Sequence, residues 1–123
     1  MSNLFFAIGS LFAALSVGMG AFAAHAATRL MTEQQLGWME KAARYNMYHA
    51  FALMLTAWAL TYWMERAALL YGAGWCFVAG ILLFSGSLYV MAFTPLRLGY
   101  ITPLGGVAFV AGWLLLAAAA WQR

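Results

Sequence analysis

The chain has 123 residues, of which 67% are hydrophobic and only 7% are charged, and its formal net charge is +3. About a quarter of the residues of a soluble domain are charged, so this composition excludes an ordinary soluble protein. Charges this sparse do not make a nucleic-acid-binding surface, and we interpret them as signals that orient the chain in a membrane.

Four stretches lack Asp, Glu, Lys and Arg, and each is about as long as the 20 residues that a helix needs to cross a bilayer. They predict membrane spans at 4–24, 45–64, 69–93 and 103–121. The expected fold class is therefore an all-α integral membrane protein, a single domain over residues 1–123. We expect four transmembrane helices in an antiparallel bundle, with the lipid bilayer as the first partner.

The first span is rich in small residues, with Ser16, Gly20 and Ala24 recurring every four positions on one helix face. Small residues at this spacing favour close helix packing in membranes. A secretory signal peptide is the alternative, because Ala24-His25-Ala26 resembles a cleavage site. The long apolar run with no Lys or Arg before it favours a retained span.

The most polar segment follows, and it predicts an interfacial helix over about residues 32–44. Thr32 and Gln35 fit a capping box, which places the helix start at this point. Trp38 suits the depth of the lipid headgroups. The pattern leaves open whether this helix lies flat on the membrane or continues into the second span.

Most of the remaining turn, helix-start and glycine signals lie in or beside the third and fourth spans. Glu65-Arg66 is nearly all of the connection before the third span, so the second and third spans are expected to be antiparallel neighbours. Thr94-Pro95 and Thr102-Pro103 each have the form of a helix start, because Thr caps and Pro fits the first turn. The residues expected to pack helices together are Ser16, Gly20, Gly80, Gly86, Gly105, Gly106 and Gly112.

Lys and Arg divide unequally between the two sides of the membrane. Arg29, Lys41, Arg44 and Arg97 fall on one side, and Arg66 and Arg123 on the other. The positive-inside rule then predicts that the first and third loops are cytoplasmic. In a bacterial inner membrane both termini would face the periplasm.

The unusual polar residues all fall in the half of the bundle nearest the basic loops. This predicted polar cluster comprises His25, Tyr45, Asn46, Tyr48, His49, Ser85, Ser87 and Thr102. Three interpretations of its two histidines are open. They pin helix ends by hydrogen bonds, they titrate in a proton or ion path, or they bind a haem or metal.

Enzyme chemistry has poor support. Ser85 and Ser87 lack a Gly-x-Ser-x-Gly turn, no predicted span contains an acid, and no phosphate-binding or dinucleotide motif occurs. We therefore expect no catalytic residue, and neither cofactor nor metal as the default.

Motifs along the whole chain resemble those of one small multi-pass membrane family. GAFAAH (20–25), RYNMYH (44–49), LFSGSLY (83–89) and ITPLGG with GW (101–106, 112–113) are similar to domain of unknown function 423, which has a mitochondrial relative called transmembrane protein 256. The first motif usually has Gly where this chain has Ala23. The resemblance implies four membrane helices, and it implies neither substrate nor cofactor.

The leading functional hypothesis is a structural or accessory inner-membrane protein that packs with itself or with a larger membrane complex. One alternative is binding or transport of a small ligand, ion or proton through the polar cluster. Another is a haem or metal protein that uses His25 and His49 as ligands.

Overall fold

The computed structural model describes residues 2–25 and 29–121, which are almost entirely helical, and no strand occurs in these ranges. The elements are, in chain order, α1 (Ser2–Ala24), α2 (Glu33–Tyr62), a short 3-10 turn η2 (Met64–Arg66), α3 (Ala67–Gly80), a π-helical turn η3 (Ile81–Ser85), α4 (Gly86–Phe93) and α5 (Thr102–Trp121).

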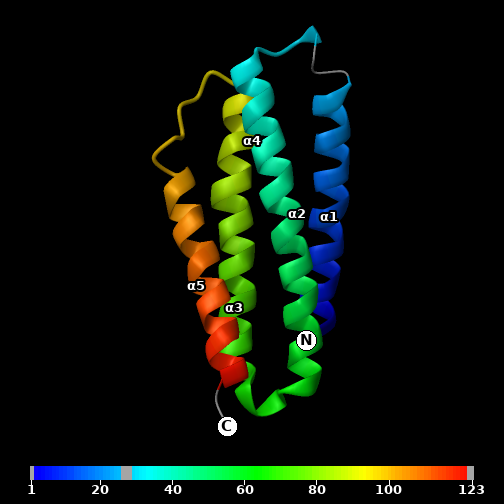
Figure 1. Ribbon diagram of the computed structural model, residues 1–123, viewed down its shortest axis with the longest axis vertical. Helices are drawn as coiled ribbons and strands as arrows, with labels where there is room; N and C mark the ends of the chain where they lie inside the picture. The colour runs from blue at the N-terminus through cyan, green and yellow to red at the C-terminus, as the bar shows by residue number, and fades with distance from the viewer. Residues whose placement is uncertain (1, 26–28, 122–123) are drawn as a thin grey trace.

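The long helices run alternately up and down the long axis of the molecule (Figure 1). We call the end where α1 and α4 finish and α2 and α5 begin the loop end, and the opposite end the terminal end. Helices α3 and α4 form one rod through η3, and this rod packs between α2 and α5, while α1 packs on α2. In the most apolar stretch of each segment, 50% of the residues of the central rod are buried, against 17% in α1 and 28% in α5.

Three helical segments in the described part of the chain are long and apolar enough to cross a membrane. They are Asn3–Ala24, Met64–Phe93 and Thr102–Trp121. Helix α2 is the longest single helix, with 30 residues, but its first half carries charged and polar side chains that lower its hydropathy.

The predicted capping box forms at the start of α2, and the helix that begins there continues into the second predicted span. Thr32 Oγ1 accepts from the backbone N–H of Gln35 at 3.2 Å, and Gln35 Oε1 accepts from the N–H of Thr32 at 2.9 Å. The helix then continues unbroken to Tyr62. Met39 and Ala42 are fully buried beside α4, so packing holds this segment on the bundle instead of flat on the membrane.

Thr94-Pro95 ends a helix, contrary to its predicted use as a start signal. The backbone N–H of Thr94 donates to Val90 O at 2.9 Å, and its hydroxyl donates to the same carbonyl at 2.8 Å. The hydroxyl oxygen also accepts from the N–H of Leu96 at 3.2 Å. Pro95 has no N–H to continue the helix, so α4 stops here.

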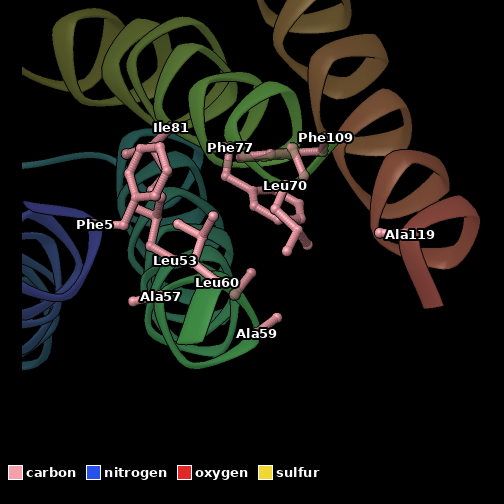
Figure 2. Packing of buried hydrophobic residues seen from close by; sticks show 12 residues of the cluster. Phe5, Leu53, Ala57, Ala59, Leu60, Leu70, Phe77, Ile81, Phe109 and Ala119 are labelled. Carbon is pink, nitrogen blue, oxygen red and sulfur yellow. The ribbon is translucent and has the colours of Figure 1, made fainter. Parts of the chain in front are cut away.

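Two hydrophobic clusters fill the bundle. The larger contains Phe5, Leu53, Phe77 and Phe109 and draws side chains from α1, α2, α3 and α5 (Figure 2). The smaller lies toward the loop end and joins α2 to α4, with α1 packed against it. Its buried members are Met39, Ala42, Leu88, Tyr89, Met91 and Ala92.

Glycines let α5 lie very close to the central rod. A Cβ on Gly80 would lie 2.3 Å from Cδ1 of Phe109, and one on Gly112 would lie 2.6 Å from Cε1 of Phe77. Each helix therefore inserts a phenylalanine over a glycine of the other. At Gly105 the approach is between backbones, since a Cβ there would lie 2.3 Å from the backbone N of Phe84.

Three other glycines expected to pack helices make no such approach. A Cβ on Gly20 would lie 3.9 Å from the Cβ of Ala43, and one on Gly86 would lie 3.8 Å from Ile81 O, both ordinary contacts. A Cβ on Gly106 would meet no atom within 4 Å. Gly106 faces outward and does not pack against another described helix of this chain.

The pair Gly105 and Gly106 gives a matched test of this packing. Gly105→Ala should lower the free energy of unfolding by about 1–3 kcal/mol, because the added methyl group would force the Phe84 backbone away. Gly106→Ala should leave the free energy of unfolding of the monomer unchanged or raise it by up to about 1 kcal/mol, because alanine favours the helix. Unfolding of both variants in mild detergent would measure the difference. Equal losses would contradict the close approach at Gly105.

Candidate functional site

The π-helical turn η3 sets the direction of the polar side chains that follow it. One extra residue in the turn changes which faces of the rod carry Ser85, Ser87 and Tyr89. Ser85 and Tyr89 then lie toward α2, and Ser87 lies toward α5, as their hydrogen bonds show.

Two side-chain hydrogen bonds join the rod to α2. The hydroxyl of Ser85, which is fully buried, donates to Ala42 O at 2.8 Å. The amide Nδ2 of Asn46, also fully buried, donates to the hydroxyl oxygen of Tyr89 at 3.1 Å. Both bonds cross between helices inside the smaller hydrophobic cluster.

A third bond joins the rod to the start of α5. The hydroxyls of Ser87 and Thr102 lie 2.6 Å apart, and Ser87 also donates to Phe84 O at 2.9 Å. Ser87 therefore directs its proton to a carbonyl while Thr102 donates to the Ser87 oxygen. The Thr102 side chain thus bonds across to α4. The sequence had instead predicted that it caps its own helix.

His49 bonds through both ring nitrogens. Nε2 lies 3.0 Å from the indole nitrogen of Trp113 and accepts its proton, because an indole N–H can only donate. Nδ1 therefore carries the imidazole proton and donates to Tyr45 O at 2.7 Å. The ring also stacks on Phe109, with centroids 3.5 Å apart and planes 7° from parallel. His49 is thus held in one neutral tautomer between α2 and α5.

Of the remaining members of the predicted cluster, Tyr45 lies beside His49, with ring centroids 6.5 Å apart, and Tyr48 and His25 lie elsewhere. Tyr48 is 52% exposed on the outer surface. Tyr45 is half-buried, and its ring packs on Phe84 with centroids 4.8 Å apart. His25 is exposed at the end of α1, where Nδ1 lies 2.9 Å from Ala21 O.

The two histidines lie far apart along the bundle. Gly20 of α1 lies level with Ala43 of α2, as their near contact shows. From this level His25 lies toward the loop end and His49 toward the terminal end. At about 1.5 Å per residue, the two are separated by roughly 16 Å along the axis. They therefore do not face a common haem or metal position.

Side-chain hydrogen bonds join α2 to the rod and to α5, and the rod to α5. Ser16 of α1 is buried at 4% exposure, and its hydroxyl has no hydrogen-bond partner. Asn46 Oδ1 likewise has none. In residues 2–25 and 29–121, no group of three or more His, Cys, Asp or Glu side chains could hold a metal ion.

An open crevice of about 670 Å³ lies at the loop end, between the first turns of α2 and the 94–100 connection. Gln34, Trp38, Arg97 and Tyr100 are among its lining residues, and no member of the predicted polar cluster is. The loop-end surface and the buried polar groups are therefore separate features.

Sequence reasoning missed Trp113 and Tyr89 as hydrogen-bond partners. Trp113 stood out only as part of a Gly-Trp pair, and Tyr89 only as the end of an LFSGSLY motif. Ser16 was assigned to helix packing, although a hydroxyl in the middle of an apolar face also requires a partner. That requirement was the available signal.

The long apolar helices, and the polar side chains that bond within the bundle, place the chain in the class of helical membrane proteins. Residues 19–106 match the family model described as "Protein of unknown function (DUF423)", and the chain belongs to this family.

Similar proteins of known sequence share this class over almost their whole lengths. The UPF0382 membrane protein YwdK of Bacillus subtilis is 41% identical, over 96% of this chain and 96% of its own length. A UPF0382 membrane protein of Staphylococcus aureus is 40% identical, over 98% and 97%. The UPF0382 inner membrane protein YgdD of Escherichia coli is 38% identical, over 86% and 83%. No solved structure matches the chain.

The bond from Trp113 to His49 is testable with a matched control. Trp113→Phe keeps the aromatic ring but removes the donor, and it should cost about 1–3 kcal/mol of unfolding free energy by leaving Nε2 unpaired. Trp121→Phe changes the same residue type at a site that is 86% exposed and should be neutral. Thermal unfolding in detergent measures both variants, and similar midpoints would argue against the bond.

Proposed function

We propose that the chain is a non-enzymatic protein of the bacterial inner membrane that crosses the bilayer four times and acts by associating with a second copy of itself. The buried polar groups support this proposal, because most of them bond within the chain, with His49 bonded through both nitrogens. Such groups hold helices together and leave little capacity to move protons or bind substrate. The outer helix surfaces then remain as the functional surfaces.

The proposal includes α2 as the fourth span. This helix lies between α1 and the central rod along their shared length, so a bilayer crossed by those neighbours surrounds α2 as well. Its part from Tyr45 to Tyr62 is free of charged residues and would extend about 27 Å as a helix, close to the thickness of the hydrocarbon core.

The loop end is proposed to be cytoplasmic. The loops and the first half of α2 at this end contain Arg29, Lys41, Arg44 and Arg97, while Arg66 lies in η2 at the terminal end. Arg66 also donates to Ala119 O at 3.2 Å. Its positive charge there stabilises the negative end of the α5 helix dipole. Arg123, which the count of charges also placed on that side, lies outside the described residues.

Reporter fusions test this orientation. Alkaline phosphatase joined after Arg123 should be active and a green fluorescent protein joined there should be dark, because both termini are proposed to be periplasmic. The same reporters joined after Leu98 in the 94–100 connection should give the reverse pattern. Fluorescence from the fusion after Arg123 would overturn the orientation.

A groove on the outer face of α5 is the observation that favours self-association. It has a volume of about 580 Å³, an almost wholly apolar lining, and Gly106 among its residues. Val107 and Val110 are exposed beside this glycine, at 67% and 58%. A small residue between larger ones lets a second membrane helix approach closely.

Disulfide crosslinking in native membranes tests this association. In a two-fold dimer, identical residues near the axis meet, so a Val110→Cys variant in a Cys76→Ala background should form a covalent dimer on mild oxidation. Leu11→Cys in the same background is the control, because Leu11 is 72% exposed on α1, away from the groove. No dimer at Val110, or equal dimer at both positions, would contradict the proposal.

A further inference from the structure

Two buried polar atoms lack partners, and they belong to neighbouring helices. Ser16 Oγ on α1 and Asn46 Oδ1 on α2 are the buried side-chain oxygens without a hydrogen bond among the described residues. Ser16 is 4% exposed and Asn46 0%. In a membrane interior no bulk water reaches such groups, so each one carries an energetic cost.

The packing of α1 on α2 places these two atoms at the same level. A Cβ on Gly9 would lie 2.7 Å from Ala50 O, and one on Gly20 would lie 3.9 Å from the Cβ of Ala43. Ser16 lies between these two glycines on the same helix face, at the i+7 and i−4 positions. Asn46 lies between Ala43 and Ala50 on the opposing face, so it is level with Ser16.

Tyr89 of α4 completes the surroundings. Its hydroxyl oxygen accepts from Asn46 Nδ2 at 3.1 Å, but its own proton has no acceptor among the described residues. Met19 and Phe22 of α1 pack against the cluster that contains Tyr89, so α1 borders this junction too. The junction thus offers two hydroxyl donors, from Ser16 and Tyr89, and one carbonyl acceptor, from Asn46.

We propose that the junction of α1, α2 and α4 binds one water molecule. The water would accept a hydrogen bond from the Ser16 hydroxyl and donate one to Asn46 Oδ1, with the Tyr89 hydroxyl as a further donor. Buried waters in proteins typically make about three hydrogen bonds to groups that are otherwise unpaired, which matches this set.

The chemistry of the junction selects a neutral, water-sized ligand. Asn46, Ser16 and Tyr89 are uncharged, and no acid lies in α1, α4 or the Tyr45–Tyr62 part of α2. Three neutral oxygens are too few for a hard cation such as Ca²⁺, which takes about six to eight. A water bridge would also give Ser16 of α1 a polar link to Asn46 of α2.

A crystal structure from a lipid phase, at a resolution that shows ordered water, tests the site directly. The expected result is a density peak about 2.7–3.2 Å from both Ser16 Oγ and Asn46 Oδ1. A direct bond between the two side chains would overturn the proposal. So would an Asn46 amide rotated to bond a backbone carbonyl with no water present, or a peak with the coordination of a metal ion.

Stability measurements give an independent test with a control on the same helix. Ser16→Ala should lower the ratio of folded to unfolded protein about fivefold, because the bridge is lost. Ser10→Ala removes an exposed hydroxyl that bonds only Phe6 O, and should change the ratio less than twofold. Equal effects of the two substitutions would overturn the proposal.

A double-mutant cycle measures whether Ser16 and Asn46 are coupled, as a shared water requires. Asn46→Ala alone should be more damaging than Ser16→Ala, because it also removes the bond to Tyr89. Ser16→Ala lowers the ratio of folded to unfolded protein by some factor in the native sequence. In the Asn46→Ala background this factor should be smaller by at least about twofold. Strict additivity would show that the two residues share no bridge and would overturn the proposal.

Discussion

A polar group inside a bilayer has no bulk water to bond, so it must find its partner within the helix bundle. This constraint organises the structure around α2, which lies between α1 and the central rod. His49 links α2 to α5 through Trp113, and Asn46 links it to α4 through Tyr89. Ser85 reaches the backbone of α2 at Ala42. Because apolar contacts against protein and against lipid are energetically similar, these directional bonds select which helix packs where.

Small residues provide the second condition for the same arrangement. Polar bonds across an interface need helices at short separation, and the Phe77–Gly112 and Phe109–Gly80 contacts bring α5 that close to the central rod. Phe109 also stacks on His49, so the residue that fills the glycine site orients the imidazole as well. Packing and hydrogen bonding at this interface are therefore coupled. A substitution at Gly80 is therefore expected to disturb the hydrogen bonds of His49, although Gly80 takes no part in them.

The sequence was informative wherever one residue type has one dominant physical use. Charge-free runs located the apolar helices, and Thr32 with Gln35 located the start of α2. It failed where tertiary contacts decide. The pattern of residues 32–44 left open whether they continue the second span, and buried Met39 and Ala42 hold them within α2. Thr94-Pro95 has the composition of a helix start, and its position after α4 makes it a helix end. The π-helical turn, which changes the faces on which the residues after it lie relative to α3, has no marker in the local sequence.

The predicted cluster shows the same limit at the level of function. Depth along a helix follows from residue number, so one half of the bundle was expected to hold the polar residues. Direction around the helix axis depends on packing, and it separates exposed Tyr48 from buried Asn46 only two positions away. Once direction is known, the two histidines lie in different environments, which weakens any function that needs both. Among the members of the predicted cluster that the structure describes, Asn46 is left with a buried, unused hydrogen-bonding atom.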